Sequence, residues 1–166
     1  MFEKGELVYY GTAGVCKITD ICTSPFGGND GRMYYVLAPN DFDNGTLIYA
    51  PTEGGNVLLR AVITQEEAEN LLASIPTLAP LNVTNEKHRR EEYRNTLKEG
   101  TPFALAVLIK TIYLRRAALV NTKKRLSETD TEFDKMARRA LLGELSASLG
   151  ITGAEAEARF DKALDE

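Results

Sequence analysis

The side chains that could perform catalysis or hold a metal are few in this sequence, and their spacing does not bring them together. His88 is the single histidine, and it stands in a strongly polar segment where a surface role is the ordinary one. Cys16 and Cys22 belong to one β-branched run, and an extended strand would separate them by ~20 Å. They therefore predict no mutual disulfide, and structural zinc would need more closely spaced cysteine pairs.

Two other patterns also lack the surroundings that their chemistry needs. The stretch Gly11–Gly14 precedes a predicted strand, whereas phosphate loops lead into a helix whose N-terminal N–H groups hold the anion. Asp41 and Asp43 lie in a predicted loop, and no base or metal ligand of the sequence can be assigned to them. We therefore expect a protein that binds other macromolecules, with no catalytic residue, no cofactor and no metal.

Charge is segregated along the chain. The 166 residues carry a formal net charge of −4, but residues 87–125 hold 11 basic and 3 acidic side chains, while residues 1–80 hold 4 basic and 10 acidic ones. Like charges are costly to cluster unless a partner neutralises them. The basic block therefore predicts an anionic partner such as nucleic acid, with a merely solvated helix surface as the alternative.

Part of the basic block falls on one face of a predicted helix, residues 85–98. At about 100° per residue, four of its basic side chains fall within about 80° of one another. They are Lys87, Arg90, Arg94 and Lys98, which we name the cationic stripe. Tyr93 and Leu97 lie beside the stripe and predict the face that packs on the protein, and Arg89 lies further round the helix.

Further basic residues complete the candidate DNA-binding set. They are Arg89, Arg115, Arg116, Lys123, Lys124 and Arg125. The last five lie near the C-terminus of a predicted helix, residues 101–119, where positive charge also favours the helix dipole. From the sequence alone, both the DNA role and the dipole role stay open for these five side chains.

The first 62 residues predict short strands separated by glycine and proline turns. The β-branched and aromatic runs are residues 7–10, 14–22, 33–37, 46–50 and 57–60. In the second run Val15 and Ile21 alternate with Cys16 and Ile18, which places Ile18 and Ile21 on opposite faces. Several short strands in so few residues favour a small antiparallel β-barrel, because a closed or nearly closed sheet protects its edges.

From Thr64 onward the period of the apolar residues is helical. Thr64–Glu67 is a capping box that begins the first helix, which ends before Pro76. Further helices, each beginning at a residue able to cap it, are expected at 85–98, 101–119, 127–149 and 152–164. Residues 101–119 are apolar nearly all round, so this helix is expected at the centre of a bundle. The inward stripe of the helix after it is predicted to be Phe133, Met136, Ala137, Ala140, Leu141 and Leu145.

These patterns together predict an α+β protein. We expect residues 1–62 to form the β domain, residues 63–84 a helix and a proline-containing connector, and residues 85–166 a helical domain. No apolar run is long enough to span a bilayer, and the N-terminus lacks the apolar core of a secretory signal. We therefore expect a cytoplasmic monomer that does not associate with membranes.

Several motifs resemble the bacterial CarD/CdnL family, in the order in which the family has them. Residues 2–18, Phe-Glu-Lys-Gly-Glu-Leu-Val-Tyr-Tyr-Gly-Thr-Ala-Gly-Val-Cys-Lys-Ile, resemble its opening. Tyr34–Leu37, Leu47–Pro51 and Leu58–Arg60 continue the resemblance. Tyr93–Gly100, followed by an apolar helix and Leu114-Arg115-Arg116, is similar to the C-terminal half of the family.

The resemblance implies a Tudor-like domain that binds RNA polymerase, similar to the one in transcription-repair coupling factors. It also implies a helical domain that contacts promoter DNA and stabilises the open complex. By position, the resemblance implies that the basic helix contacts the DNA. It implies that the polymerase β subunit is contacted by Tyr34, Tyr35, Val36, Leu47, Ile48 and Tyr49. Such a protein would bind DNA weakly, without sequence preference, through contacts to the DNA backbone. It would associate with the nucleoid through the polymerase.

The chain departs from the family pattern at positions that bear on function. Many members place a tryptophan ahead of the basic helix, where it wedges against the opened DNA. This chain has no tryptophan, and the corresponding position falls near Asn82 or Val83. That absence and the net negative charge leave a second interpretation open, an adaptor on RNA polymerase whose helical domain binds an acidic protein and not DNA.

Overall fold

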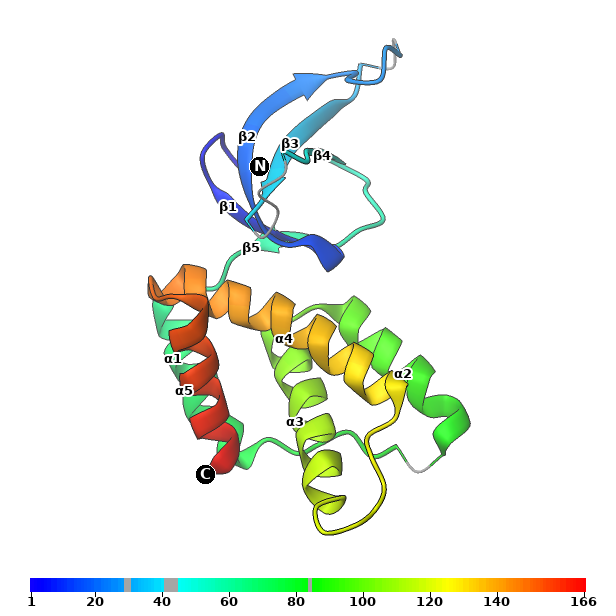
Figure 1. Ribbon diagram of the computed structural model, residues 1–166. Helices are drawn as coiled ribbons and strands as arrows, with labels where there is room; N and C mark the ends of the chain where they lie inside the picture. The colour runs from blue at the N-terminus through cyan, green and yellow to red at the C-terminus, as the bar shows by residue number, and fades with distance from the viewer. Residues whose placement is uncertain (29–30, 41–44, 84) are drawn as a thin grey trace. The chain divides into compact units, whose positions relative to one another are not determined.

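The computed structural model describes residues 1–28, 31–40, 45–83 and 85–166, so the Asp41 and Asp43 pair lies outside the described residues. The chain divides into two compact units, Met1–Val62 and Ile63–Glu166. The first holds β-strands and the second holds α-helices (Figure 1), which confirms the α+β class. The segment 63–84 belongs to the second unit, with the helices.

The first unit is one five-stranded antiparallel sheet. Its strands are β1 (Leu7–Tyr10), β2 (Gly14–Thr23), β3 (Met33–Pro39), β4 (Ile48–Pro51) and β5 (Leu59–Ala61), with a 3-10 turn η1 (Gly11–Ala13) between the first two. The strand order is β4-β3-β2-β1-β5, so β4 and β5 are the edge strands. Each neighbouring pair is antiparallel.

The core of the sheet corrects the predicted alternation along β2. Cys16 and Ile18 are fully buried in the core, and Ile21 packs against the same core. Ile18 pairs with Leu37 but Asp20 pairs with the next residue of β3, Val36, so the register shifts at one extra residue. This β-bulge rotates the strand and brings Ile21 back to the buried face, whereas strict alternation placed it opposite Ile18.

The second unit consists of α1 (Gln65–Ser74), a 3-10 turn η2 (Ile75–Thr77), α2 (Glu86–Glu99), α3 (Pro102–Ala118), α4 (Glu128–Leu149) and α5 (Gly153–Asp165). The predicted capping residues are confirmed, because the side chain of each accepts a hydrogen bond from a backbone N–H in the first helical turn. They are Thr64, Asn85, Thr101, Ser127 and Thr152. Gly100 and Gly150 end α2 and α4 in the left-handed conformation that favours glycine.

The helix α3 lies at the centre of the second unit, as its apolar circumference predicts. All nine residues from Ala104 to Ile112 are buried, and α2 and α4 pack against this helix. Phe103 and Leu114 were expected in the core but are 60% and 40% exposed, because they lie outside the buried stretch, toward the two ends of the helix. Among the helices of the described ranges, none is long and apolar enough to cross a bilayer.

The predicted inward stripe of α4 is largely confirmed. Five of its six residues are buried, and Met136 is half-buried. The buried residues are Phe133, Ala137, Ala140, Leu141 and Leu145. The ring of Phe133 meets the ring of Tyr93 edge to face, with centroids 5.7 Å apart, so this stripe fixes the inner face of α2.

Candidate nucleic-acid and protein interfaces

The cationic stripe lies on the exposed face of α2. Lys87, Arg90, Arg94 and Lys98 are all exposed, whereas Tyr93 is fully buried and Leu97 is half-buried. The helix therefore divides as the periodicity predicts, with an aromatic side chain inside and a row of cations outside. The row extends over three helical turns, and its side chains lie where a negatively charged surface could approach them.

Arg89 lies inside the helical unit, although the sequence grouped it with the DNA-binding cations. It is four residues before Tyr93, so both side chains point to the same buried face, and Arg89 is only 7% exposed. Its guanidinium lies 3.7 Å from Asp130 Oδ1 and 3.3 Å from Glu86 Oε1. The positive charge of Arg89 is therefore balanced within the protein.

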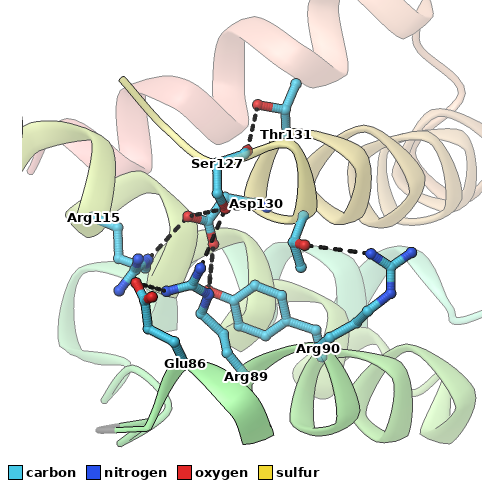
Figure 2. A network of polar contacts seen from close by, with 9 residues as sticks. Glu86, Arg89, Arg90, Arg115, Ser127, Asp130 and Thr131 are labelled. Carbon is cyan, nitrogen blue, oxygen red and sulfur yellow. Dashed lines mark hydrogen bonds and ion pairs between the residues drawn. The ribbon is translucent and has the colours of Figure 1, made fainter. Parts of the chain in front are cut away.

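Asp130 is the centre of a polar network that joins α2, α3 and α4. Figure 2 shows its carboxylate between Arg89, Arg115 and Ser127. Tyr93 donates its hydroxyl hydrogen to Oδ1 at 2.8 Å, Arg115 Nε donates to Oδ2 at 3.2 Å, and the Ser127 hydroxyl donates to Oδ2 at 3.0 Å. Because each donor comes from a different segment, the network fixes how α2 is rotated on the bundle.

The network also sets the charge states of its members. Burial raises the pKa of Asp130, but hydrogen bonds from Tyr93 and Arg115 and the charge of Arg115 outweigh burial, so this pKa lies below its ordinary value. Burial, and then the hydrogen bond to the Asp130 carboxylate, raise the pKa of Tyr93. Asp130 is therefore ionised and Tyr93 neutral at neutral pH, which is the state that the hydrogen bonds require.

Arg90 has the opposite orientation from Arg89 although the two are adjacent in sequence. Its guanidinium points toward the exposed first turn of α4 (Figure 2), where it lies 3.4 Å from Glu132 Oε2 and 3.4 Å from Thr129 Oγ1. It also lies 5.9 Å from the ring centroid of Phe133. Both side chains of the Arg90 and Glu132 pair are about half exposed, so a phosphate could replace the carboxylate.

The remaining basic candidates separate into two groups. Arg115 and Arg116 lie in the last turn of α3 and are paired with Asp130 and Asp134 respectively, at 3.2 and 3.5 Å. Lys123, Lys124 and Arg125 are exposed and lie beyond the end of α3. Because the effect of a helix dipole falls off within the last turn, it does not account for these three cations.

Asn82 and Val83, where the resemblance would place a tryptophan, lie just ahead of the cationic stripe in the chain. Asn82 is exposed and Val83 is half-buried, and both precede Asn85, the residue that caps α2. The structure therefore brings this position and the N-terminal end of the stripe close together along the chain. A short polar side chain and a small apolar one take the place of a large aromatic ring.

The β unit exposes only part of the predicted polymerase-binding set. Tyr35 and Val36 are 1% and 7% exposed. Tyr35 packs in the core of the sheet, and Val36, the next residue of β3, is buried on the opposite face. They belong to the core and cannot form the contact surface that the sequence predicted. Leu47, which lies outside β4 and not within a strand as expected, is 47% exposed, and Tyr49 on β4 is 36% exposed.

Phe26 is a surface residue that sequence reasoning missed. It is 74% exposed in the connection between β2 and β3, and its ring packs edge to face against Tyr34 and Tyr49 with centroid distances of 5.9 and 5.5 Å. We name these three residues the aromatic patch. The signal was a phenylalanine between Pro25 and Gly27-Gly28, where the turn residues explain the turn but not the exposed ring.

A family model described as CarD, C-terminal domain, matches residues 77–161. No curated protein sequence matches the chain. The matched range covers half of the chain and includes the cationic stripe, the Asp130 network and the position of Asn82.

Proposed function

Because the chain belongs to the CarD family of transcription regulators, we propose that its β unit binds the RNA polymerase β subunit and that its helical unit contacts promoter DNA. The DNA contact would stabilise the open complex, in which the promoter strands are separated. The observation that carries this proposal is the cationic stripe, which stands exposed on α2 while the inner face of the same helix is fixed by Tyr93 and Asp130.

The DNA-contacting surface consists of the exposed cations and leaves out Arg89. We assign it to Lys87, Arg90, Arg94, Lys98, Lys123, Lys124 and Arg125. Arg115 and Arg116 are paired with acidic residues of α4, so they contribute less to DNA binding. In this proposal these side chains contact phosphates, and because phosphate contacts carry no direct sequence information, the contact is independent of promoter sequence.

The free protein binds DNA weakly in this proposal. The chain carries a net charge of −4, and only the basic surface attracts phosphate, so the affinity falls in the non-specific range of ~10⁻⁴ to 10⁻⁶ M. Binding to the polymerase tethers the helical unit near the promoter. Tethering raises the effective DNA concentration to about the millimolar range, which is sufficient for a weak surface to act.

The polymerase contact uses the edge of the sheet and the aromatic patch. Within the described part of the chain β4 has a neighbouring strand on one side only, so its other side can add to a strand of the partner, and Tyr49 lies on this strand. Phe26 and Tyr34 enlarge the apolar area beside it. Aromatic residues of this kind commonly dominate the energy of protein interfaces.

A second candidate function is an adaptor whose helical unit binds an acidic protein. The observation that favours it is the absence of a tryptophan, because Asn82 and Val83 offer no large ring to insert into opened DNA. Both candidates use the same cations, so loss of binding alone does not separate them. The lifetime of the open complex separates them, because only the DNA contact changes it directly.

The experiment combines one variant of each surface with a control that matches its change of charge. Tyr49→Glu should abolish co-purification with RNA polymerase, and Arg90→Gln with Arg94→Gln should shorten the open-complex lifetime while polymerase binding is kept. Lys135→Gln with Lys162→Gln removes the same charge from exposed positions outside α2. An open complex that is equally long-lived with the stripe variant and with the control variant would remove the DNA role and favour the adaptor.

A further inference from the structure

Two adjacent polar residues interrupt the buried apolar stretch of α3. Lys110 and Thr111 are 8% and 5% exposed, and apart from these two the residues from Ala104 to Ile112 are alanine, valine, leucine or isoleucine. A buried ammonium group is costly unless it is hydrogen-bonded. The pair therefore requires an explanation that packing of the bundle does not supply.

Lys110 reaches the end of the first helical segment. Its ammonium Nζ donates to the carbonyl oxygens of Ile75 and Pro76, at 2.6 and 2.9 Å. These carbonyls lie in η2, directly after α1, where the helix dipole is negative. The Ile75 carbonyl also accepts a hydrogen bond from the Leu78 N–H at 3.2 Å, so Lys110 adds a second donor to it. Lys110 thus fixes the start of the segment that leads from α1 to α2.

Thr111 holds the same segment six residues further on. Its Oγ1 accepts a hydrogen bond from the Leu81 N–H at 2.8 Å and donates to the Val107 carbonyl oxygen at 2.7 Å. The hydroxyl therefore has one fixed orientation, with its hydrogen directed to α3 and its lone pair to Leu81. The residues between η2 and Leu81 form no helix or strand of their own, so these contacts from α3 determine their path.

We infer that Lys110 and Thr111 are positioning residues for the DNA contact, because they hold the segment 75–81 on α3 and so place Asn82 beside the N-terminus of α2. This inference rests on the proposed function, and it adds Asn82, the exposed residue ahead of the cationic stripe, to the proposed DNA contact. The short Asn82 side chain spans less distance than a tryptophan ring. Its contact with DNA therefore depends more strongly on where the backbone is held.

The test compares two substitutions at Thr111, one that removes the hydroxyl and one that keeps it. Thr111→Val keeps the shape of the side chain and removes the acceptor for Leu81, whereas Thr111→Ser keeps the acceptor. In the free protein, Thr111→Val should speed hydrogen exchange of the Leu81 amide about tenfold, because this amide loses its hydrogen bond to the Thr111 hydroxyl. It should shorten the open-complex lifetime several-fold, and Thr111→Ser should match the unchanged protein in both measurements.

A third measurement separates positioning from general destabilisation. The affinity of the free protein for non-specific duplex DNA reports the cationic stripe, and we expect it to be unchanged in Thr111→Val. Lys110→Met, which keeps the stem and removes the ammonium, provides a second variant and should shorten the open-complex lifetime in the same way. If the affinity for duplex DNA falls together with the open-complex lifetime, Lys110 and Thr111 only maintain the fold. That result overturns the inference.

The outcome also distinguishes this inference from the proposed function. If Thr111→Val speeds Leu81 exchange but leaves the lifetime unchanged, while the Arg90 and Arg94 double variant shortens it, the positioning role is wrong and the proposed function stands. If neither variant changes the lifetime, both are wrong. Unchanged Leu81 exchange in Thr111→Val would show that the hydroxyl does not hold the segment, and would also overturn the inference.

Discussion

The two sides of α2 use the same residue type for opposite purposes. Arg89 and Arg90 are neighbours in sequence, but Arg89 is 7% exposed and is paired with Asp130, while Arg90 is exposed and its carboxylate partner, Glu132, is at the surface. Buried ion pairs fix geometry, because a lone charge left behind in the interior is strongly destabilising. Exposed pairs contribute little to stability, and their cations stay available to an external anion.

This comparison shows why counting charges along the chain overestimates a binding surface. The basic block predicts an anionic partner, yet three of its arginines are occupied by acidic residues of α4 that are buried or nearly so. They are Arg89 and Arg115, which pair with Asp130, and Arg116, which pairs with Asp134. The available charge is on the outer face of α2 and in the segment after α3, and the inner charges serve to orient that face.

The largest expected effect comes from breaking the inner pair. Asp130→Asn leaves the buried guanidinium of Arg89 with only the exposed carboxylate of Glu86 as a partner, and we expect unfolding in urea to show a loss of about 3–5 kcal/mol. Glu132→Gln removes the outer partner of Arg90 and should change stability by no more than about 0.5 kcal/mol. Equal losses in the two variants would contradict the distinction between the inner and outer arginines.

The hydrogen bonds and charge that Asp130 receives from Tyr93 and Arg115 should show themselves in the pH dependence of stability. Because the folded state holds the pKa of Asp130 below its ordinary value of 3.8, the stabilising effect is complete above that pH and is lost as the pH falls through the folded pKa. The Asp130→Asn variant should not show this part of the loss of stability at acidic pH. Thermal unfolding measured from pH 3 to pH 7 in both proteins checks the difference.

Much of the helical unit could be predicted from the sequence, because its signals are local. A cap, a 3.6-residue period and a terminal glycine are each decided within one or two turns, so the helices, their caps and the exposed row on α2 appear where expected. The place of Arg89 could not be predicted in this way. Its burial depends on Asp130, which lies 41 positions away in the chain and shows no local pattern linking the two.

The β unit was harder to predict because strand pairing decides exposure. Tyr35 and Val36 have the residue types of a contact surface, but Tyr35 packs in the core of the sheet and Val36 is buried on its other face. A single extra residue in β2 reverses the alternation from which faces are assigned. Phe26 was missed because it joins Tyr34 and Tyr49 in the aromatic patch through ring contacts between separate parts of the chain, which no local pattern indicates.

The second-largest effect sharpens the comparison in the β unit, between buried Tyr35 and exposed Phe26. Phe26→Ala should weaken binding to RNA polymerase about tenfold, because exposed aromatic anchors carry much of the energy of an interface. The free energy of unfolding should stay nearly unchanged. Val120→Ala, at a 63% exposed position of the helical unit, is the control and should leave polymerase binding as it is.

A smaller effect is expected from the hydroxyl group of the inner network. Tyr93→Phe removes one donor to Asp130 and should cost about 1 kcal/mol at neutral pH. Because the pKa of Tyr93 is raised above its ordinary 10.0, the unfolded state loses this proton first, and stability falls as the pH rises above 10. The variant should lack that part of the loss, so its stability and that of the unchanged protein converge at alkaline pH. A gap that stays constant from pH 7 to pH 11 would contradict the burial of a neutral Tyr93.

The smallest effect tests whether the outer pair restrains binding. Glu132 occupies the guanidinium of Arg90 that a DNA phosphate would take, at 3.4 Å, so Glu132→Gln should strengthen binding to non-specific duplex DNA about two- to threefold at low salt. Glu157→Gln makes the same change of net charge on the exposed face of α5 and is the matched control. A larger gain for Glu132→Gln than for Glu157→Gln, shrinking as salt is added, would show that the carboxylate competes directly for Arg90. Equal gains in affinity would mean that only net charge matters. The Glu132 carboxylate would then not restrain DNA binding by Arg90 in the unchanged protein.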